Sequence, residues 1–375
     1  MRFISLQENL KRGLGIVGHA TSKNINLPIL NNILIKTQDG NIELVSTNLE
    51  IGVRHTLRGK IESEGEFTVD SKLISEYVNL LTSGDKVEVE EVSGELKVEA
   101  GNFKTKIKGE EAKDFPLIPT ILEDRSYTCE ISNLKKSLSS VVFAVSNSEN
   151  RMELTGVLFS FSENKLSLAA TDSYRLAEKI MDIEGGETGE EVRAIVPAKT
   201  IQELLRILNS FDSHQEIDGE SNIKIALSEN QILFAFDSVS LISRLINGRY
   251  PEYKQIIPNK SQTEASVDRQ EMVRAVKAVS LFSKTGINDI TVSFHKDKLV
   301  ISAFSGSSGE SQAEVEADNK GGDNEITINY RYLLDGLNNI SSERVTLKVL
   351  NNNTPCLIRP DGQDDYLYIV MPIRQ

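Results

Sequence analysis

Side chains that could act as nucleophiles, general bases or metal ligands are few in this chain of 375 residues, and they lie far apart along it. The four histidines have no second ligand at a spacing typical of zinc sites, so we interpret each as structural or solvent-facing: His19, His55, His214 and His295. Residues 282–286 read Phe-Ser-Lys-Thr-Gly but lack the glycine lead-in of a phosphate-binding loop. The chain has neither a Gly-x-Ser-x-Gly elbow nor a Cys-x-x-Cys pair. The sequence therefore favours a protein without an active site, a metal or a cofactor over an enzyme.

The bulk properties predict ordered globular domains in a reducing compartment. Hydrophobic residues make up 39% of the chain, and no segment has the composition of a long disordered tail. The two cysteines, Cys129 and Cys356, are too few for a disulfide framework. The first ten residues lack the apolar core of a signal peptide, and no run is long enough to span a membrane. We therefore expect a cytoplasmic protein.

The element that positions everything else is a segment that occurs three times, at residues 69–81, 196–208 and 328–340. In the second copy, apolar residues at 201, 204, 205 and 208 gather on one face of a helix, and Gly336 is the one gap in the stripe of the third copy. A short strand-like run precedes each helix. The spacing divides the chain into thirds, so we predict three domains at residues 1–123, 124–259 and 260–375.

Each third contains the same further elements. A helix-like stretch opens it, at residues 6–19, 131–146 and 268–282, and a hairpin follows, at residues 33–48, 157–172 and 290–304. A second hairpin closes it, at residues 86–100, 222–236 and 344–358. Two helices and several strands, repeated three times, predict an α+β fold of three tandem domains.

Charge is distributed unevenly between these elements. The net charge of −13 argues against nucleic acid when taken alone. The six predicted helices, however, contain eleven basic and six acidic residues, which leaves about −18 for the remainder. Lys and Arg are good helix formers, which explains part of this bias, but Glu is equally good and is abundant outside the helices. The distribution favours a basic functional face made by helices.

Several short motifs, in order along the chain, carry a resemblance to a known family. They are Leu27-Pro28-Ile29-Leu30, Ser46-Thr47-Asn48-Leu49-Glu50, Ala170-Thr171-Asp172-Ser173-Tyr174-Arg175-Leu176, Val196-Pro197-Ala198-Lys199, Asn247-Gly248-Arg249-Tyr250-Pro251-Glu252-Tyr253 and Tyr368-Ile369-Val370-Met371-Pro372-Ile373-Arg374. In these pieces the chain resembles the β subunit of bacterial DNA polymerase III, the sliding clamp family. The resemblance covers the whole length and includes the threefold repeat.

The resemblance implies a head-to-tail homodimer, a ring of six domains whose helices line a central hole around double-stranded DNA without reading its sequence. It implies a non-catalytic processivity factor in the bacterial cytoplasm, at nucleoid-associated replication forks, with the polymerase catalytic subunit, the clamp loader and other proteins with clamp-binding motifs as partners. ATP and magnesium would belong to the loader, so we expect no cofactor. The residues expected to face DNA are Lys11, Arg12, Lys23, Lys72, Lys135, Lys136, Arg151, Lys199, Arg206, Arg269, Arg274, Lys277 and Arg331.

Two segments of opposite charge suggest how the ring closes. Residues 103–108 alternate with lysines on one face, as an edge strand would, and residues 312–317 offer glutamates on a matching strand. These charges would equally protect exposed edges from aggregation. The resemblance places the two edges together across the dimer interface, with Leu81, Lys104, Lys106, Ile107, Lys108, Leu281, Phe282, Glu310, Glu314 and Glu316.

The family also implies a hydrophobic pocket between the second and third domains that binds short peptides of partner proteins. Its expected lining is Leu154, Thr171, Ser173, Tyr174, Arg175, Leu176, Pro251, Ile256, Ile287, Asn329, Tyr332, Ile369, Val370, Met371, Pro372, Ile373 and Arg374. Core packing is the competing explanation for the aliphatic members, above all Leu154 and Val370. The chain departs from the family pattern at Ser173, Tyr174, Gln255, Asn353 and Gln375, which leaves the preferred peptide open.

Two other functions remain open at this point. The first is a DNA-processing enzyme built on the same repeat, and the second is a peptide-binding scaffold that never contacts DNA.

Overall fold

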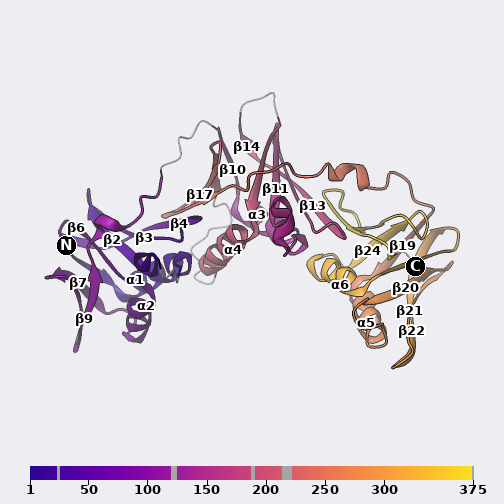
Figure 1. Ribbon diagram of the computed structural model, residues 1–375, viewed down its shortest axis with the longest axis horizontal. Helices are drawn as coiled ribbons and strands as arrows, with labels where there is room; N and C mark the ends of the chain where they lie inside the picture. Colours follow the sequence, from indigo (N-terminus) through magenta and orange to yellow (C-terminus); the bar gives the residue numbers. More distant parts are fainter. Residues whose placement is uncertain (23–25, 120–124, 187–190, 213–221, 374–375) are drawn as a thin grey trace. The chain divides into compact units, whose positions relative to one another are not determined.

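The computed structural model describes residues 1–22, 26–119, 125–186, 191–212 and 222–373 (Figure 1). The chain divides into two compact units. Unit 1 comprises Met1–Ser132, Glu184–Glu187 and Lys199–Leu245, and unit 2 comprises Asn133–Ile183, Thr188–Ala198 and Ile246–Gln375. Each unit is built on one continuous antiparallel sheet.

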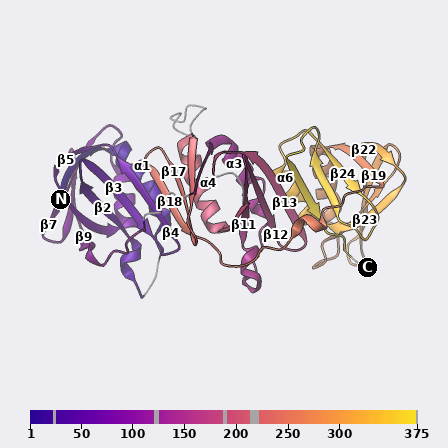
Figure 2. The ribbon, with the colours of Figure 1, turned by 90° about the horizontal axis from the view of Figure 1, so that it is seen from above.

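The sheet of unit 1 has 14 strands among the described residues, and neighbouring strands such as β2, β3 and β4 can be followed in Figure 2. In sheet order they are β14 (Glu184–Gly185), β10 (Arg125–Glu130), β16 (Asn222–Leu227), β17 (Gln231–Phe236), β18 (Val239–Arg244), β4 (Ile51–Leu57), β3 (Asn41–Thr47), β2 (Asn32–Gln38), β6 (Gly65–Asp70), β9 (Phe103–Glu110), β8 (Glu95–Ala100), β7 (Lys86–Val92), β1 (Arg2–Leu6) and β5 (Lys60–Ser63).

The sheet of unit 2 has 12 strands within the described ranges. Their order is β15 (Val192–Pro197), β11 (Gly156–Ser162), β12 (Lys165–Thr171), β13 (Arg175–Asp182), β26 (Tyr366–Val370), β25 (Cys356–Pro360), β24 (Arg344–Val349), β19 (Thr263–Asp268), β22 (Gly309–Gly321), β21 (Lys298–Ser305), β20 (Asp289–Phe294) and β23 (Asn324–Asn329).

The helices occur at the positions that the threefold repeat predicts. They are α1 (Gln7–Val17), α2 (Ser71–Leu80), α3 (Ile131–Ser139), α4 (Ala198–Asp212), α5 (Arg269–Ser280) and α6 (Tyr330–Asn339). Polar side chains begin three of them: Asp70 accepts a hydrogen bond from the Leu73 amide, Asp268 from Glu271 and Asn329 from Arg331. In unit 1, α1 packs on β3 and β4 and against α2, and in unit 2, α5 packs on β19–β22 and against α6.

The apolar stripes are buried as predicted. In α4, Ile201, Leu204 and Leu208 are fully buried, although Ile207 takes the buried place that we assigned to Leu205. The gap at Gly336 has a physical reason, because a Cβ there would lie 2.2 Å from Cε1 of the buried Tyr368 ring. The glycine therefore lets α6 approach the sheet closely.

One helix is shorter than predicted. The helix expected at residues 131–146 ends at Ser139, and a 3-10 turn, Val142–Ala144, follows it. The Ser140 hydroxyl donates to the carbonyl oxygen of Ser137, a side-chain bond that competes with helix continuation. Val141, Ala144 and Val145 are nevertheless buried. The apolar pattern therefore predicted the burial of these residues correctly, but the helix that it predicted was too long.

A buried histidine in unit 1 makes the stability of the protein pH-dependent. His55 on β4 is 6% exposed, and its Nδ1 lies 3.2 Å from the Ser238 hydroxyl. Burial, and then the nearby charge of Arg12, lower the pKa of His55 to about 4 from 6.5. Between those values the unfolded chain binds the proton and the folded chain does not, so stability falls as pH falls.

Because of this histidine, we expect the unfolding free energy to fall by about 2 kcal/mol between pH 7.5 and pH 5. Urea unfolding at both pH values would measure it, with His55→Gln losing this part of the pH dependence. His295→Gln is the matched control, because His295 follows β20 in the hairpin turn with 43% of its side chain exposed, and its replacement should retain the loss of stability that His55 causes. Equal pH dependence in His55→Gln and the unmodified protein would contradict the assignment.

Candidate functional site

A hydrogen-bonded turn at residues 171–175 in unit 2 forms the centre of the predicted peptide site. The Asp172 carboxylate accepts hydrogen bonds from the amides of Tyr174 (2.9 Å) and Arg175 (3.0 Å), and the Thr171 hydroxyl donates to the Arg175 carbonyl at 2.6 Å. Ser173 has φ +79°, a left-handed conformation that non-glycine residues rarely adopt. The turn leaves Tyr174 62% exposed on the surface.

Arg175 is held inside the fold at this turn. Its guanidinium pairs with Asp172 at 3.0 Å and with Asp335 of α6, donates to the Phe143 carbonyl at 2.9 Å, and lies 4.9 Å from the centre of the Tyr332 ring. Only 10% of the side chain is exposed. The residue therefore ties α6 to β13 and has little surface left for a ligand.

Residues 371–373 pack beside the turn. The Met371 amide donates to the Tyr174 carbonyl at 2.9 Å, and the Ile373 amide donates to Thr327 at 2.8 Å. The Tyr174 and Tyr332 rings stack with centroids 6.3 Å apart. An aromatic pair, the exposed Tyr174 and the partly buried Tyr332, thus lies next to the backbone of residues 371–373.

The remaining residues of the predicted lining differ in exposure. The buried members are Leu154, Thr171, Leu176, Ile369 and Val370. The partly buried members are Arg175, Pro251, Asn329, Tyr332, Met371, Pro372 and Ile373, the exposed members are Ser173, Tyr174, Ile256 and Ile287, and Arg374 lies outside the described residues. Leu154, Leu176 and Ile369 belong to one apolar cluster with Tyr250 and Tyr253, and Met371 packs against it. These aliphatic residues make a core beneath the surface that Tyr174 and Met371 offer.

Unit 1 contains the same turn with a different surface. Asn48 accepts from the amides of Glu50 and Ile51, Thr47 donates to the Ile51 carbonyl at 2.9 Å, and Leu49 has φ +74°. Glu50 occupies the place of Tyr174 in this copy of the turn. The amide that donates to the Glu50 carbonyl belongs to Arg244, where unit 2 has Met371.

The apolar space beneath this copy of the turn is filled from within the chain. Gly52 stands where unit 2 has Leu176, and a Cβ on Gly52 would lie 2.8 Å from Ile118 Cδ1, so the Ile118 side chain occupies that space. The space beneath the turn in unit 1 is therefore filled, and the apolar side chain exposed on that turn is Leu49, at 42%, where unit 2 has Ser173.

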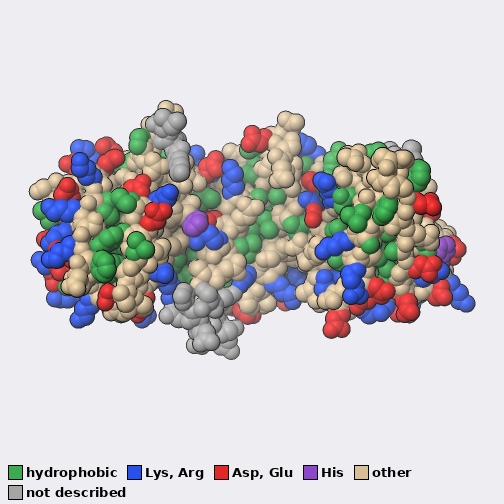
Figure 3. Space-filling view, turned by 90° about the horizontal axis from the view of Figure 1, so that it is seen from below, with side chains coloured by type: hydrophobic (Ala, Val, Ile, Leu, Met, Phe, Trp, Pro, Cys, Tyr) green, Lys and Arg blue, Asp and Glu red, His purple; other side chains and the backbone are tan. Residues whose placement is uncertain are grey.

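The basic residues predicted on the helices divide into two groups. The exposed ones are Lys11, Lys72, Lys136, Arg151, Lys199, Arg274, Lys277 and Arg331, while Arg12, Lys135, Arg206 and Arg269 are partly buried and Lys23 lies outside the described residues. Figure 3 shows Lys and Arg side chains over the visible surface of both units, interspersed with Asp and Glu.

Three of the predicted DNA-facing arginines have structural partners. Arg206 donates to the carbonyl oxygens of Gly15 (3.0 Å) and Ile16 (2.7 Å), and it pairs with Glu203. Arg269 donates to the carbonyls of Ser342 and Leu337. Arg12 stacks over the Phe211 ring at 4.3 Å. Periodicity could place these residues on helices, but it could not show that distant carbonyls and a ring would engage them.

Two strands have stretches with one unpaired edge. In β9, residues 103–108 pair with β8 alone, because β6 pairs only with Gly109 and Glu110. In β22, residues 309–316 pair with β21 alone, and residues 317–321 pair with β19. The exposed charges on these edges are Lys104, Lys106 and Lys108 on β9, and Glu310, Glu314 and Glu316 on β22.

The apolar residues near these edges are partly those predicted. Leu281 is 77% exposed and Phe282 is partly buried, but Leu81 and Ile107 are 5% and 4% exposed, so both already belong to the core of unit 1. Sequence reasoning missed Phe103 and Phe304, which are 55% and 63% exposed. Phe103 is an aromatic residue at the first position of an alternating strand, and this position was the signal that the sequence offered.

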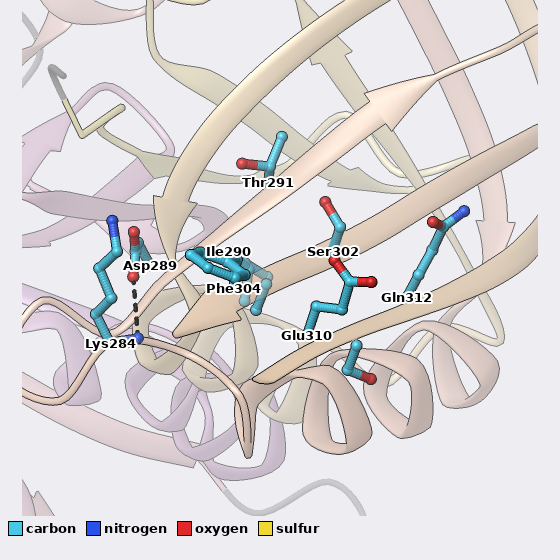
Figure 4. Close-up of a pocket in the computed structure, with 10 residues that line it drawn as sticks. Lys284, Asp289, Ile290, Thr291, Ser302, Phe304, Glu310 and Gln312 are labelled. Carbon is cyan, nitrogen blue, oxygen red and sulfur yellow. Dashed lines mark hydrogen bonds between the residues drawn. The ribbon is translucent and has the colours of Figure 1, made fainter. Parts of the chain in front are cut away.

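A cavity of about 520 Å³ lies beside the free edge of β22. Figure 4 shows Phe304 and Glu310 among its lining side chains, and the Lys284 amide donating to the Asp289 carboxylate at 3.3 Å. Its walls combine both charges with apolar surface. This composition suits a contact with another protein surface.

The described residues contain no cluster of three or more His, Cys, Asp or Glu side chains that could hold a metal ion. Burial raises the pKa of both thiols, Cys129 and Cys356, to about 12, so neither is a ready nucleophile. No helix in the described ranges is long and apolar enough to cross a membrane.

Three family descriptions match consecutive parts of the chain: DNA polymerase III beta subunit, N-terminal domain at residues 1–119, central domain at 128–252 and C-terminal domain at 254–374. A beta sliding clamp of Staphylococcus aureus is 29% identical over 366 residues, covering 95% of this chain and 94% of the relative. One from Synechocystis is 28% identical over 399 residues, covering 100% and 99%.

Solved structures agree with these matches over the full chain. The DNA polymerase III subunit beta of Pseudomonas aeruginosa has a TM-score of 0.92 at 26% identity, covering 100% of both chains. A sliding clamp of Bartonella birtlesii bound to griselimycin has a TM-score of 0.92 at 29% identity, again covering 100% of both. The chain is therefore composed of three clamp domains and belongs to the DNA polymerase III beta subunit family, the beta sliding clamps.

Proposed function

We propose that this protein is a processivity factor that closes around duplex DNA as a head-to-tail homodimer and has no catalytic activity of its own. The observation that carries the proposal is the pair of free strand edges of opposite charge on β9 and β22. A head-to-tail contact needs two different surfaces on one chain, and these edges supply them. The predicted domain limits at residues 123 and 259 are part of the same proposal.

The internal repeat indicates how two copies would pair. β18 closes the second domain and pairs with β4 of the first, with Leu241 opposite Val53. β26 closes the third domain and pairs with β13 of the second, with Tyr368 opposite Ala177. The equivalent edges that pair with no other described strand are residues 103–108 of β9, which closes the first domain, and residues 309–316 of β22 in the third.

Applying the same register to β9 and β22 places Thr105 opposite Ser311 of a second copy. Lys106 then lies opposite Glu310, and Phe103 lies opposite Ala313. Opposite charges that meet across a pair of strands fix register and orientation. Two copies of three domains would complete a ring of six.

DNA would be held through its phosphates. Exposed lysines and arginines on the helices can contact phosphates without reading bases, which permits sliding. The acidic remainder of the surface would repel DNA elsewhere. The residues that we propose to contact DNA do not include Arg206, Arg269 and Arg12, because these side chains already bind carbonyl groups or an aromatic ring.

Partner proteins would dock a short peptide on the surface around Tyr174. The support is the exposed Tyr174, stacked on Tyr332 beside Met371 and above an apolar cluster. The equivalent turn in unit 1 offers Glu50 and Arg244 in their place. We therefore propose one peptide site per chain.

The test of the function is retention on DNA. After loading by a clamp loader with ATP, the protein should remain on nicked circular DNA through gel filtration and should be lost when a restriction enzyme cuts that circle. Equal retention on the circular and the cut DNA would reject encirclement. Retention on neither, with peptide binding intact, would favour a scaffold, and a DNA-modifying activity would favour an enzyme.

The peptide site can be tested with griselimycin, the ligand bound to the Bartonella birtlesii clamp. We expect Tyr174→Ala to weaken binding by about tenfold, because an exposed aromatic side chain at the centre of a small site supplies roughly 1–2 kcal/mol. Isothermal titration calorimetry measures the change. Glu50→Ala, at the equivalent turn of unit 1, is the matched control and should bind as the unmodified protein does. Equal losses in both variants would contradict the site.

A further inference from the structure

A small cavity in unit 2, of about 240 Å³, lies between the ends of α3 and α6 and the turn after β25. Lys136 and Ser139 come from α3, Ser140 directly follows α3, Lys179 comes from β13, Asn338 from α6 and Gln363 from the turn after β25. Two of these side chains are cationic and the others named are neutral with hydrogen-bond donors. No Asp or Glu is among the described residues that line the cavity.

The internal repeat explains why this space is open. When Val196 is matched with Ile328, Arg206 of α4 corresponds to Asn338 of α6. When the first residues of α1 and α3 are matched, Gly15 and Ile16 correspond to Ser139 and Ser140. In unit 1 the Arg206 guanidinium fills the equivalent position and bonds to the carbonyls of Gly15 and Ile16. The shorter Asn338 leaves that volume empty.

Helix C-termini ordinarily favour cations, but three carbonyl groups near the ends of these two helices already have donors. The Ser140 carbonyl accepts from the Tyr366 hydroxyl at 3.2 Å, the Leu337 carbonyl accepts from Arg269 at 3.2 Å, and the Asp335 carbonyl accepts from Asn339 at 2.9 Å. Lys179 pairs with Asp365, which does not line the cavity. Of the two cationic side chains that line the cavity, Lys136 is the exposed one.

We infer that this cavity binds a phosphate group, with the Lys136 ammonium as its main charge partner and the Ser139 hydroxyl and the Asn338 and Gln363 amides as donors. The phosphate would come either from the DNA backbone or from a free phosphate ion. The DNA source rests on the proposed function, and the free ion does not. A DNA phosphate seated here would be held in a defined place, unlike one that meets exposed lysines alone.

The decisive variant is Asn338→Arg. It fills the cavity as Arg206 does in unit 1 while adding a positive charge. If the phosphate enters the cavity, Asn338→Arg should weaken binding despite the added charge. If only the overall charge of the helices matters, it should strengthen binding.

The experiment uses the full-length protein and two probes. The first is a fluorescein-labelled linear duplex, followed by anisotropy at several salt concentrations. Lys136→Ala and Asn338→Arg should each lower affinity about tenfold and reduce the slope of log K against log salt by about 0.9, the value for one phosphate. Lys165→Ala, at an exposed lysine of the β11–β12 hairpin, should leave both unchanged.

The second probe is inorganic phosphate, measured as the rise in melting temperature over sodium chloride of equal ionic strength. A rise that both variants abolish, with DNA affinity unchanged, identifies the free ion as the ligand. Loss of DNA affinity without a phosphate-dependent rise identifies the DNA backbone. Asn338→Arg binding both probes as well as or better than the unmodified protein would overturn the inference. Encirclement is tested separately by retention on circular DNA, so failure of this site leaves that result standing.

Discussion

Phe103→Asp should convert the protein from a dimer to a monomer at concentrations where the unmodified chain is dimeric. Phe103 begins the free edge of β9 and is 55% exposed in a single chain, so a partner strand would bury most of the remaining ring. Losing that burial and placing a carboxylate in the contact should raise the dimer dissociation constant at least about a hundredfold, or roughly 3 kcal/mol. Sedimentation velocity over a concentration series measures the change.

Val92→Asp is the matched control for this substitution. Val92 is 43% exposed at the end of β7 in the same domain, away from the free edge, so its replacement should leave the dimer intact. If Phe103→Asp remained dimeric, the free edge of β9 would not be the contact surface. If both variants dissociated, general loss of folding would be the cause, and circular dichroism would reveal it.

The same assay can test the proposed register. Lys106→Glu and Glu310→Lys should each weaken the dimer, because each places like charges opposite one another, and the double variant should recover most of the loss. Recovery by pairing Lys106→Glu with Glu314→Lys instead would place the strands in a different register.

Gly336→Ala should lower the unfolding free energy of unit 2 by about 3 kcal/mol. The added methyl would lie 2.2 Å from Cε1 of Tyr368, which is fully buried and donates its hydroxyl hydrogen to the Tyr332 carbonyl at 2.7 Å. The ring can retreat only by breaking that bond or by displacing α6 from the sheet. Urea unfolding followed by tyrosine fluorescence measures the loss.

Gly15→Ala is the contrasting case and the control for helix propensity. Gly15 lies inside α1, and no atom comes within 4 Å of a Cβ built there. The substitution should therefore stabilise unit 1 by about 1 kcal/mol, because alanine loses less backbone entropy in a helix. Destabilisation by both alanines would show that close packing against Tyr368 is not what makes Gly336 necessary.

The repeat made the fold predictable from the sequence. Alternating residues around Asp39-Gly40 give β2 and β3, and both turn residues have positive φ, as the Asp-Gly pair predicts. The length of α3 was not predictable in the same way. Its apolar pattern continues past Ser139 because burial continues, and periodicity cannot separate a buried helix from a buried turn.

The candidate sites were only partly predictable, because their geometry depends on contacts between distant residues. Tyr174 could be named from a motif, whereas the ties that hold Arg175 to Asp335 join residues 160 positions apart. Arg206 looked like a residue facing DNA because it is basic and lies on a helix. Its partners, the carbonyls of Gly15 and Ile16, carry no side-chain signal that a sequence could reveal.

Because both native thiols are buried, cysteines introduced at the surface can be cross-linked selectively. With pKa values of about 12, Cys129 and Cys356 hold almost no thiolate at neutral pH, so maleimides and oxidants would react only with cysteines introduced at the surface. Cysteines placed at positions 106 and 310 would lie opposite each other in the proposed register. A disulfide there would lock the ring shut, so that release from circular DNA would require either a reductant or a cut strand.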